Sequence, residues 1–189
     1  MARYSAVQFP LHTMRAQRDA AYWRNPVCRT AASWPGSNMA TYFDDFQAGL
    51  VERYGHYVVT RDEVISFARQ YDPQPFHLDD AAAARTFFGK VAASGWHTGA
   101  MAMRMMVDHW TRTDRKSLGS PGLDEVRWLK PVYPGDSLRI EDEWLELRAS
   151  SSRPERGTAR VRTTVYNQHD EPVMRFVGLV MLARRPPAG

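Results

Sequence analysis

The chain has 189 residues, of which 43% are hydrophobic, and this is enough apolar material for one domain with its own core. No run of about 18 apolar residues occurs, so we predict no transmembrane helix. Cys28 is the only cysteine, which excludes an intrachain disulfide and favours a reducing, cytoplasmic location. The formal net charge of +4 could indicate a nucleic-acid partner. However, the excess positive charge lies in residues 1–38 and the remaining residues are neutral overall, so we predict none.

Residues 1–38 mix proline, serine and arginine with scattered aromatic residues and show no sustained period. Such a composition buries little apolar surface, so we predict a disordered extension before a single domain of residues 39–189. Met39 is a candidate for the native start of the protein. An Arg-rich transit peptide is the alternative, whereas a secretory signal would need an apolar segment that residues 1–38 lack.

Residues 50–60 are rich in Tyr and Val and predict a strand. Thr60 and Glu63 then have the spacing of a capping box at the start of a helix, which we expect to end near Gln70. The following stretch, residues 71–79, reads Tyr-Asp-Pro-Gln-Pro-Phe-His-Leu-Asp. Two prolines within three residues are incompatible with a regular helix, so we predict a stiff, kinked loop.

This predicted loop holds an acid, Asp72, and an imidazole, His77. An acid and an imidazole on one rigid loop can share a water molecule and move its proton, as general acid–base catalysis requires. Asp72 could instead cap the preceding helix. Asp79 is a good N-cap for a helix predicted over residues 79–88. Because capping explains the acidic residues after His77, we predict no metal site.

Residues 92–110 predict a helix that is apolar on most of its circumference and is therefore buried. Its methionines favour flexible filling of a core, and an adaptable acyl pocket is the alternative. Residues 111–122 are polar and contain Gly-Ser-Pro-Gly, which predicts a loop.

The remaining sequence has the period of β-strands. We predict four strands joined by short turns, over residues 123–129, 137–148, 158–168 and 172–183. Successive long strands with short connections must be antiparallel. One early strand, a helical block and an antiparallel meander together indicate an α+β fold.

The motif of residues 71–79 is followed by Phe-Phe-Gly at 87–89 and by Ala-Ser-Gly at 93–95. This combination resembles the signature of the MaoC-like (R)-specific enoyl-CoA hydratase family, from about residue 42 to the last strand. The resemblance implies a hot-dog fold, in which an antiparallel sheet wraps around a central apolar helix, and it implies a homodimer. It also implies a lyase that reversibly adds water to a trans-2-enoyl-CoA. The product would be a 3-hydroxyacyl-CoA, with coenzyme A as the carrier of the substrate and no other cofactor.

Hydration of an enoyl thioester needs a base for water, an acid for the α-carbon and donors for the enolate-like oxygen. Asp72 and His77 can supply the first two around one water molecule. Backbone N–H groups at a helix start can supply the third, and the resemblance assigns Gly95 to this oxyanion hole. Close helix packing is the alternative explanation for Gly95.

The sequence departs from the family pattern at two positions. Many members have histidine at the position of Ser94, and a serine that some members carry further along the helix corresponds to Ala100. We predict Ser94, Trp96 and His97 as substrate-binding residues, with a hydrogen-bonded helix histidine as the alternative for His97. These departures leave the length and polarity of the acyl chain open.

A hot-dog module that binds acyl thioesters without hydrating them is the alternative function, and a thioesterase is a further variant. We expect a thioesterase to present a carboxylate on the central helix. That predicted helix contains only Asp108, near its far end. The intact spacing of Asp72 and His77 therefore favours the hydratase.

Overall fold

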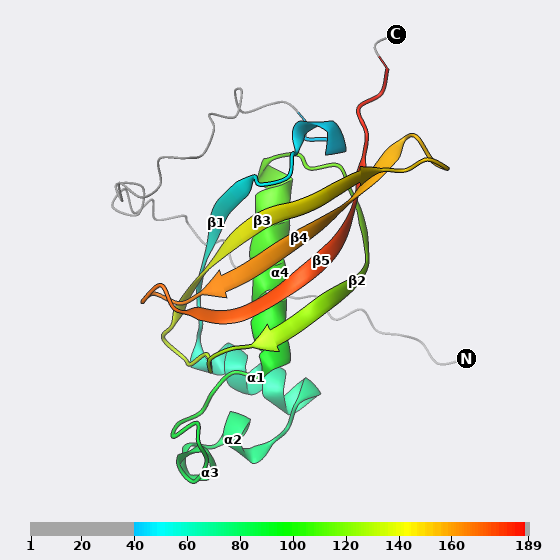
Figure 1. Cartoon of the computed structure of the whole chain (residues 1–189). Coiled ribbons are helices and arrows are strands. Elements are labelled where there is room, and N and C mark those ends of the chain that lie inside the picture. Colours follow the sequence, from blue (N-terminus) through cyan, green and yellow to red (C-terminus); the bar gives the residue numbers. More distant parts are fainter. Residues whose placement is uncertain (1–39, 188–189) are drawn as a thin grey trace, which may run out of the picture. The chain divides into compact units, whose positions relative to one another are not determined.

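The computed structural model describes residues 40–187, so the predicted extension, residues 1–38, lies outside the described part of the chain. A short 3-10 turn, η3 (Phe43–Asp45), precedes a strand, four helices and four further strands (Figure 1). They are β1 (Val51–Val58), α1 (Arg61–Tyr71), α2 (Pro75–Leu78), α3 (Asp80–Ala84), α4 (Gly95–Arg112), β2 (Ser117–Trp128), β3 (Ser137–Ala149), β4 (Arg156–Tyr166) and β5 (Pro172–Ala183).

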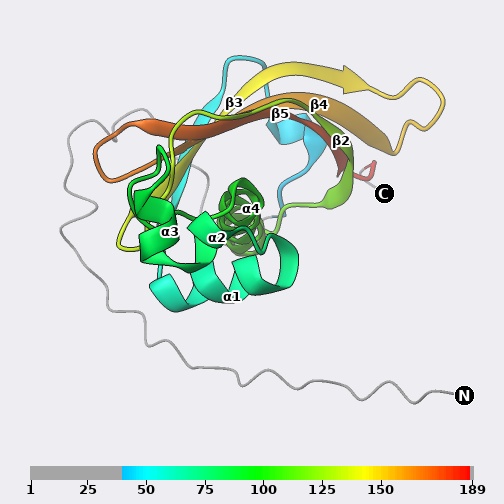
Figure 2. The same ribbon diagram turned by 90° about the horizontal axis from the view of Figure 1, so that it is seen from below.

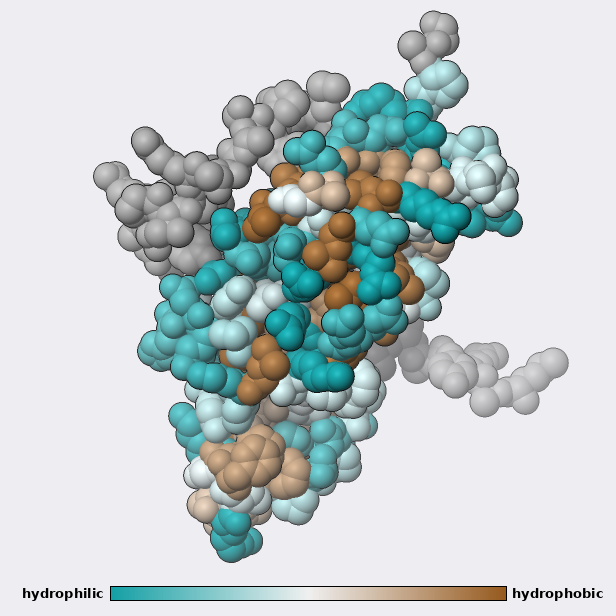
Figure 3. Space-filling view, in the orientation of Figure 1, coloured by the Kyte–Doolittle hydropathy of each residue, from teal (hydrophilic) through white to brown (hydrophobic). Residues whose placement is uncertain are grey.

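The five strands form one antiparallel sheet in the order β1-β3-β4-β5-β2. The sheet curves over α4, and α1 lies beneath this helix on the side away from the sheet (Figure 2). The predicted α+β hot-dog fold is therefore confirmed. The outer face of the sheet is mainly hydrophilic with small apolar patches (Figure 3). Ion pairs such as Arg53–Glu141 and Arg162–Glu143 link neighbouring strands on that face.

The position of β2 differs from the prediction. A simple meander would place β2 beside β3, but β2 instead pairs with β5 at the other edge of the sheet. The strand also begins at Ser117, within the segment predicted to be a loop. Its pairing with β5 shifts register at several points, and irregular edge strands accommodate Gly and Pro.

The helices follow the predicted capping signals but differ in their bounds. Thr60 caps α1 and accepts a hydrogen bond from the Glu63 N–H at 3.3 Å, as the sequence predicted. The proline-containing stretch is not entirely a loop, because Pro75 begins the one-turn helix α2. A proline at the first helical position loses no intrahelical bond, since that N–H has no partner in any helix. The predicted helix over residues 79–88 is shorter, because α3 ends at Ala84.

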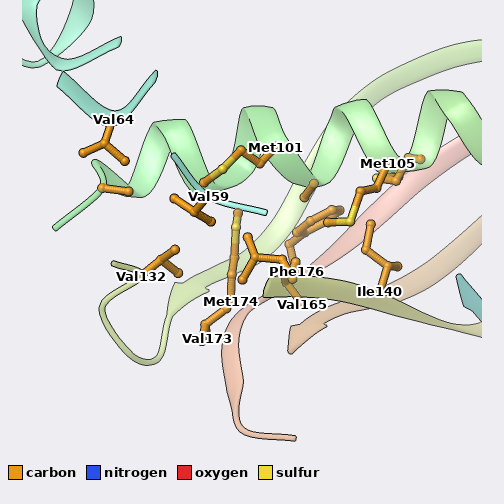
Figure 4. Close-up of a cluster of buried hydrophobic side chains, with 14 of the residues drawn as sticks. Val59, Val64, Met101, Met105, Val132, Ile140, Val165, Val173, Met174 and Phe176 are labelled. Atoms are coloured by element: carbon orange, nitrogen blue, oxygen red, sulfur yellow. The ribbon is translucent and has the colours of Figure 1, made fainter. Parts of the chain in front are cut away.

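Helix α4 begins at Gly95, three residues later than predicted, because Ser94 caps it. Met101 and Met105 pack against side chains of the sheet, including Met174 and Phe176 (Figure 4). This supports the interpretation of these methionines as core filling. The expectation of burial on most of the circumference is wrong for the single chain, because Met103 is 46% and Val107 is 43% exposed.

Near the C-terminal end of α4, two acidic residues on neighbouring strands are buried opposite each other. Glu52 of β1 pairs in register with Asp142 of β3. Glu52 accepts hydrogen bonds from Arg115 at 2.8 and 3.0 Å, from the Trp144 indole at 2.9 Å and from His109 at 3.2 Å. The sequence analysis did not anticipate this cluster.

Asp142 accepts hydrogen bonds from Tyr54 at 2.5 Å and Thr163 at 2.7 Å, and it is 2% exposed. Burial raises the pKa of Asp142 to about 6, from an ordinary value of 3.8. Between these two values the folded chain holds a proton that the unfolded chain releases. The stability contributed by this proton is present below pH 3.8 and is lost as the pH rises through about 6.

We expect Asp142→Asn to stabilise the protein at pH 8 by about 1–3 kcal/mol and to have little effect near pH 4. Asparagine keeps the shape of the side chain but cannot ionise, so it removes the cost of a buried charge. Its amide nitrogen only donates, so the hydroxyl that faces it, which can donate or accept, turns to accept. Urea unfolding at the two pH values measures the difference. An effect of equal size at both values would mean that Asp142 does not titrate in the folded protein.

Candidate active site

Asp72 and His77 lie close together where α1 ends and α2 follows. Asp72 is the C-cap of α1 and His77 lies in α2. His77 Nδ1 is 2.7 Å from the carbonyl oxygen of Ala92, and His77 Nε2 is 3.4 Å from Asp72 Oδ2. Because a carbonyl oxygen only accepts hydrogen bonds, Nδ1 carries the proton of the neutral ring. Nε2 therefore presents a lone pair towards Asp72.

Two donors hold the Asp72 carboxylate. The Ser94 hydroxyl donates to Oδ2 at 2.6 Å, and the side-chain amide of Gln74 donates to Oδ1 at 2.8 Å. Partial burial acts to raise the pKa of Asp72, but these two hydrogen bonds and the neighbouring His77 hold it below the usual 3.8. The carboxylate is therefore ionised at neutral pH and can accept a proton.

The backbone at the start of α4 provides a third group. Gly95 is the first residue of α4, and its N–H makes no hydrogen bond within residues 40–187. The N-terminal N–H groups of a helix are free donors at the positive end of the helix dipole. Together, these groups comprise two proton acceptors, Asp72 and His77, that can bind one water molecule, and a free donor, the Gly95 N–H, at the start of α4.

A family model described as "MaoC like domain" matches residues 48–167. The chain belongs to the MaoC-like family. A MaoC-like dehydratase from Rhodospirillum rubrum has a similar structure, with a TM-score of 0.70 and 35% sequence identity. This alignment covers 78% of the present chain and 99% of the R. rubrum chain.

Two further relatives have hydratase or dehydratase names. The 3-hydroxybutyryl-CoA dehydratase of Methylorubrum extorquens is 31% identical over 152 residues, which are 78% of this chain and 87% of that protein. The R-hydratase PhaJ1 of Pseudomonas aeruginosa has a TM-score of 0.60 and 25% identity, covering 78% of this chain and 95% of its own. The MaoC-like chain is thus similar to proteins that hydrate or dehydrate.

The three residues predicted to bind substrate differ in their surroundings. Ser94 is 1% exposed and contacts Asp72. Trp96 is 67% exposed, and its ring lies edge to face with that of Trp128, with centroids 5.3 Å apart. His97 is buried and stacks on Phe67 with centroids 4.6 Å apart, and its Nδ1 has no hydrogen-bond partner within residues 40–187.

Within residues 40–187, Nδ1 of the buried His97 ring has no partner that would make it the hydrogen-bonded helix histidine considered as its alternative, so that alternative stays a prediction. Burial lowers the pKa of His97, and the nearby Glu63 only partly opposes this effect. The ring therefore favours the neutral form. Sequence reasoning also missed the contacts of Gln74 and Ala92. Gln74 lies inside the motif of residues 71–79, whereas a backbone carbonyl carries no signal in the sequence.

Among the described residues, no helix is both long and apolar enough to cross a membrane. Within the same residues, no group of three or more His, Cys, Asp or Glu side chains is arranged to hold a metal ion.

Gly95 also packs closely, which was the alternative explanation for this residue. A Cβ atom at Gly95 would lie 2.6 Å from Cε2 and Nε1 of Trp128. We expect Gly95→Ala to displace the half-exposed Trp128 ring towards solvent and to destabilise the fold by about 1 kcal/mol, the lower end of the cost of overpacking. Thermal unfolding measures this loss.

Gly99→Ala is the matched control in the same helix. Its Cβ atom would meet only Met174 Cε, at an ordinary distance of 3.6 Å. Because alanine is favoured over glycine inside a helix, we expect this variant to be neutral or up to about 1 kcal/mol more stable. Equal losses in both variants would contradict the importance of the Trp128 contact.

Proposed function

We propose that the chain is a hydro-lyase that reversibly adds water to a trans-2-enoyl-CoA, giving a 3-hydroxyacyl-CoA. The observation that supports this most is the pair of facing proton acceptors, Asp72 Oδ2 and His77 Nε2, 3.4 Å apart. One water molecule can donate a proton to each of them, which leaves a lone pair of its oxygen free to attack. The membership of the MaoC-like family and the named relatives support the same reaction class.

In the proposed reaction, the water oxygen forms a bond with the β-carbon while one water proton passes to the Asp72–His77 pair. The electrons of the double bond move to the thioester, whose oxygen becomes enolate-like. The free N–H of Gly95 donates to this oxygen, and such donors typically contribute about 10²–10³-fold in rate. The proton held by the pair then returns to the α-carbon on the same face, which restores the thioester.

We further propose that a second copy of the chain covers the exposed edge of the sheet. Strand β2 is exposed along most of its length, and Leu118, Leu123 and Trp128 are each close to half exposed. Long unpaired edge strands with apolar side chains are sites of pairing between chains. Light scattering should therefore give twice the mass of the chain, and a monomer at micromolar concentration would contradict this proposal.

The decisive experiment follows the loss of enoyl-thioester absorbance with crotonyl-CoA and with longer, branched and polar enoyl-CoAs. Crotonyl-CoA is the first substrate to test, because the M. extorquens relative is named as a 3-hydroxybutyryl-CoA dehydratase. A parallel assay for free thiol detects thioesterase activity. Release of thiol without hydration would favour the thioesterase, and binding without turnover of any substrate would favour the acyl-thioester binding module.

A further inference from the structure

The hydroxyl of Ser94 makes two hydrogen bonds, one as donor and one as acceptor. It donates to Asp72 Oδ2 at 2.6 Å and accepts from the Trp96 N–H at 3.3 Å. Ser94 is 1% exposed, so its side chain has almost no surface for contact with a substrate. The surroundings of Ser94 therefore differ from those of a substrate-binding residue.

We propose that Ser94 is a positioning residue, which holds Asp72 in its orientation and charge state and links it to the oxyanion donor, Gly95. This inference rests on the proposed function for the roles of Asp72 and Gly95. The two hydrogen bonds of Ser94 are observed independently of that function.

The direction of the Ser94 hydroxyl proton follows from its partners. A hydroxyl has one proton, and the N–H of Trp96 occupies a lone pair of the oxygen, so the proton points to Asp72. The backbone of Ser94 is held as well, because its carbonyl accepts from the N–H of Thr98 at 3.0 Å and from the Thr98 hydroxyl at 3.3 Å. Neither the main chain nor the side chain is free to turn away.

Ser94 also sets the spacing of the site. Gly95 is its neighbour in the chain, so the hydrogen bond to Asp72 fixes the carboxylate relative to the Gly95 N–H. Two residues earlier, the carbonyl of Ala92 holds His77 through Nδ1 at 2.7 Å. The segment of residues 92–95 thus contacts both proton acceptors and supplies the free donor.

The second donor to Asp72 provides an internal comparison. Gln74 is exposed, so water can replace its hydrogen bond to Oδ1 when its side chain is removed. Ser94 is buried, so its hydrogen bond to the partly buried Asp72 carboxylate has no such substitute. Removing a buried hydrogen-bond partner of a charged group has a larger effect than removing an exposed one. Ser94 should therefore influence Asp72 more strongly than Gln74 does.

The first test is a carboxyl titration by NMR on the full chain labelled with [4-13C]aspartate. Loss of one resonance in Asp72→Asn assigns Asp72. We expect the titration midpoint of the Asp72 carboxyl to be higher in Ser94→Gly than in the wild type. The rise should be smaller in Gln74→Ala. In Ser94→Thr, which restores a hydroxyl, the midpoint should be close to that of the wild type. Glycine is a good replacement here because it still caps a helix, so the fold is retained while the donor is lost.

The second test separates positioning from substrate binding. We expect Ser94→Gly to lower kcat by about tenfold, the effect of losing one hydrogen bond to a charged group, with KM changed little. A rise in KM at unchanged kcat would overturn the proposal in favour of a substrate contact. A midpoint that stays at the wild-type value in Ser94→Gly, or a folded Ser94→Thr that behaves like Ser94→Gly, would also overturn it.

These outcomes are separable from those of the proposed function. A raised midpoint in a protein that hydrates no enoyl-CoA would support the role of Ser94 and contradict the hydratase. Hydration together with an unchanged midpoint would support the hydratase and contradict the role of Ser94.

Discussion

Asp72→Asn is expected to lower the rate of enoyl-CoA hydration by about 10²–10⁴-fold, the range typical of a lost general acid or base. Asparagine has the size of aspartate and can still accept the Ser94 hydrogen bond through its amide oxygen. It cannot take up a proton from water, and its amide nitrogen places two donors where the carboxylate had acceptors. We expect a loss of similar size for His77→Gln.

Because the two groups act on one water molecule, the losses should not be additive. The double variant is expected to be about as slow as the slower single variant, as is found when residues act as a unit. Initial rates with crotonyl-CoA measure the loss in the two single variants and in the double variant. Circular dichroism shows whether each variant is folded.

Asp79→Asn is the matched control for this series. Asp79 belongs to the same motif, but its carboxylate caps α3 by accepting from the Ala82 N–H at 2.8 Å. Asparagine caps a helix as well as aspartate does, so rate and stability should stay near those of the wild type. Turnover that survives both Asp72→Asn and His77→Gln would place the active site elsewhere in the chain.

Arg115→Met should have the largest effect on stability, a loss of about 3–5 kcal/mol. The Arg115 side chain is 3% exposed, and its guanidinium faces the buried Glu52 carboxylate at 2.8 Å. Methionine fills part of the volume but leaves Glu52 without its cation, and an uncompensated buried charge is costly. Urea unfolding at pH 7 measures the loss.

The double variant Glu52→Gln/Arg115→Met tests whether the unpaired charge of Glu52 causes the loss of stability. Removing the charge of Glu52 together with that of Arg115 should recover part of the lost stability, because no unpaired charge then remains. The surface pair Arg53–Glu141, whose side chains are 42% and 26% exposed, is the comparison. We expect Arg53→Met to cost no more than about 1 kcal/mol. A loss in Arg115→Met as small as that would contradict the importance of the buried pair.

The sequence alone was sufficient for features that depend on neighbouring residues. The Thr60 cap and the antiparallel strands with their alternating faces could be predicted, because capping and periodicity are local properties. Asp72 and His77 could be singled out in the same way, since they lie five positions apart on a segment stiffened by two prolines. Their resemblance to a known motif supplied the reaction class.

The tertiary structure decided which distant groups meet. The sequence of β2 does not specify which strand it pairs with, and the strand is exposed along most of its length, so its pairing with β5 could not be read from the pattern. Ser94 and Asp72 are 22 residues apart, and Trp144 reaches Glu52 across 92 residues. Such contacts depend on how the sheet curves over α4, because hydrogen bonds between distant segments form only after packing brings them together.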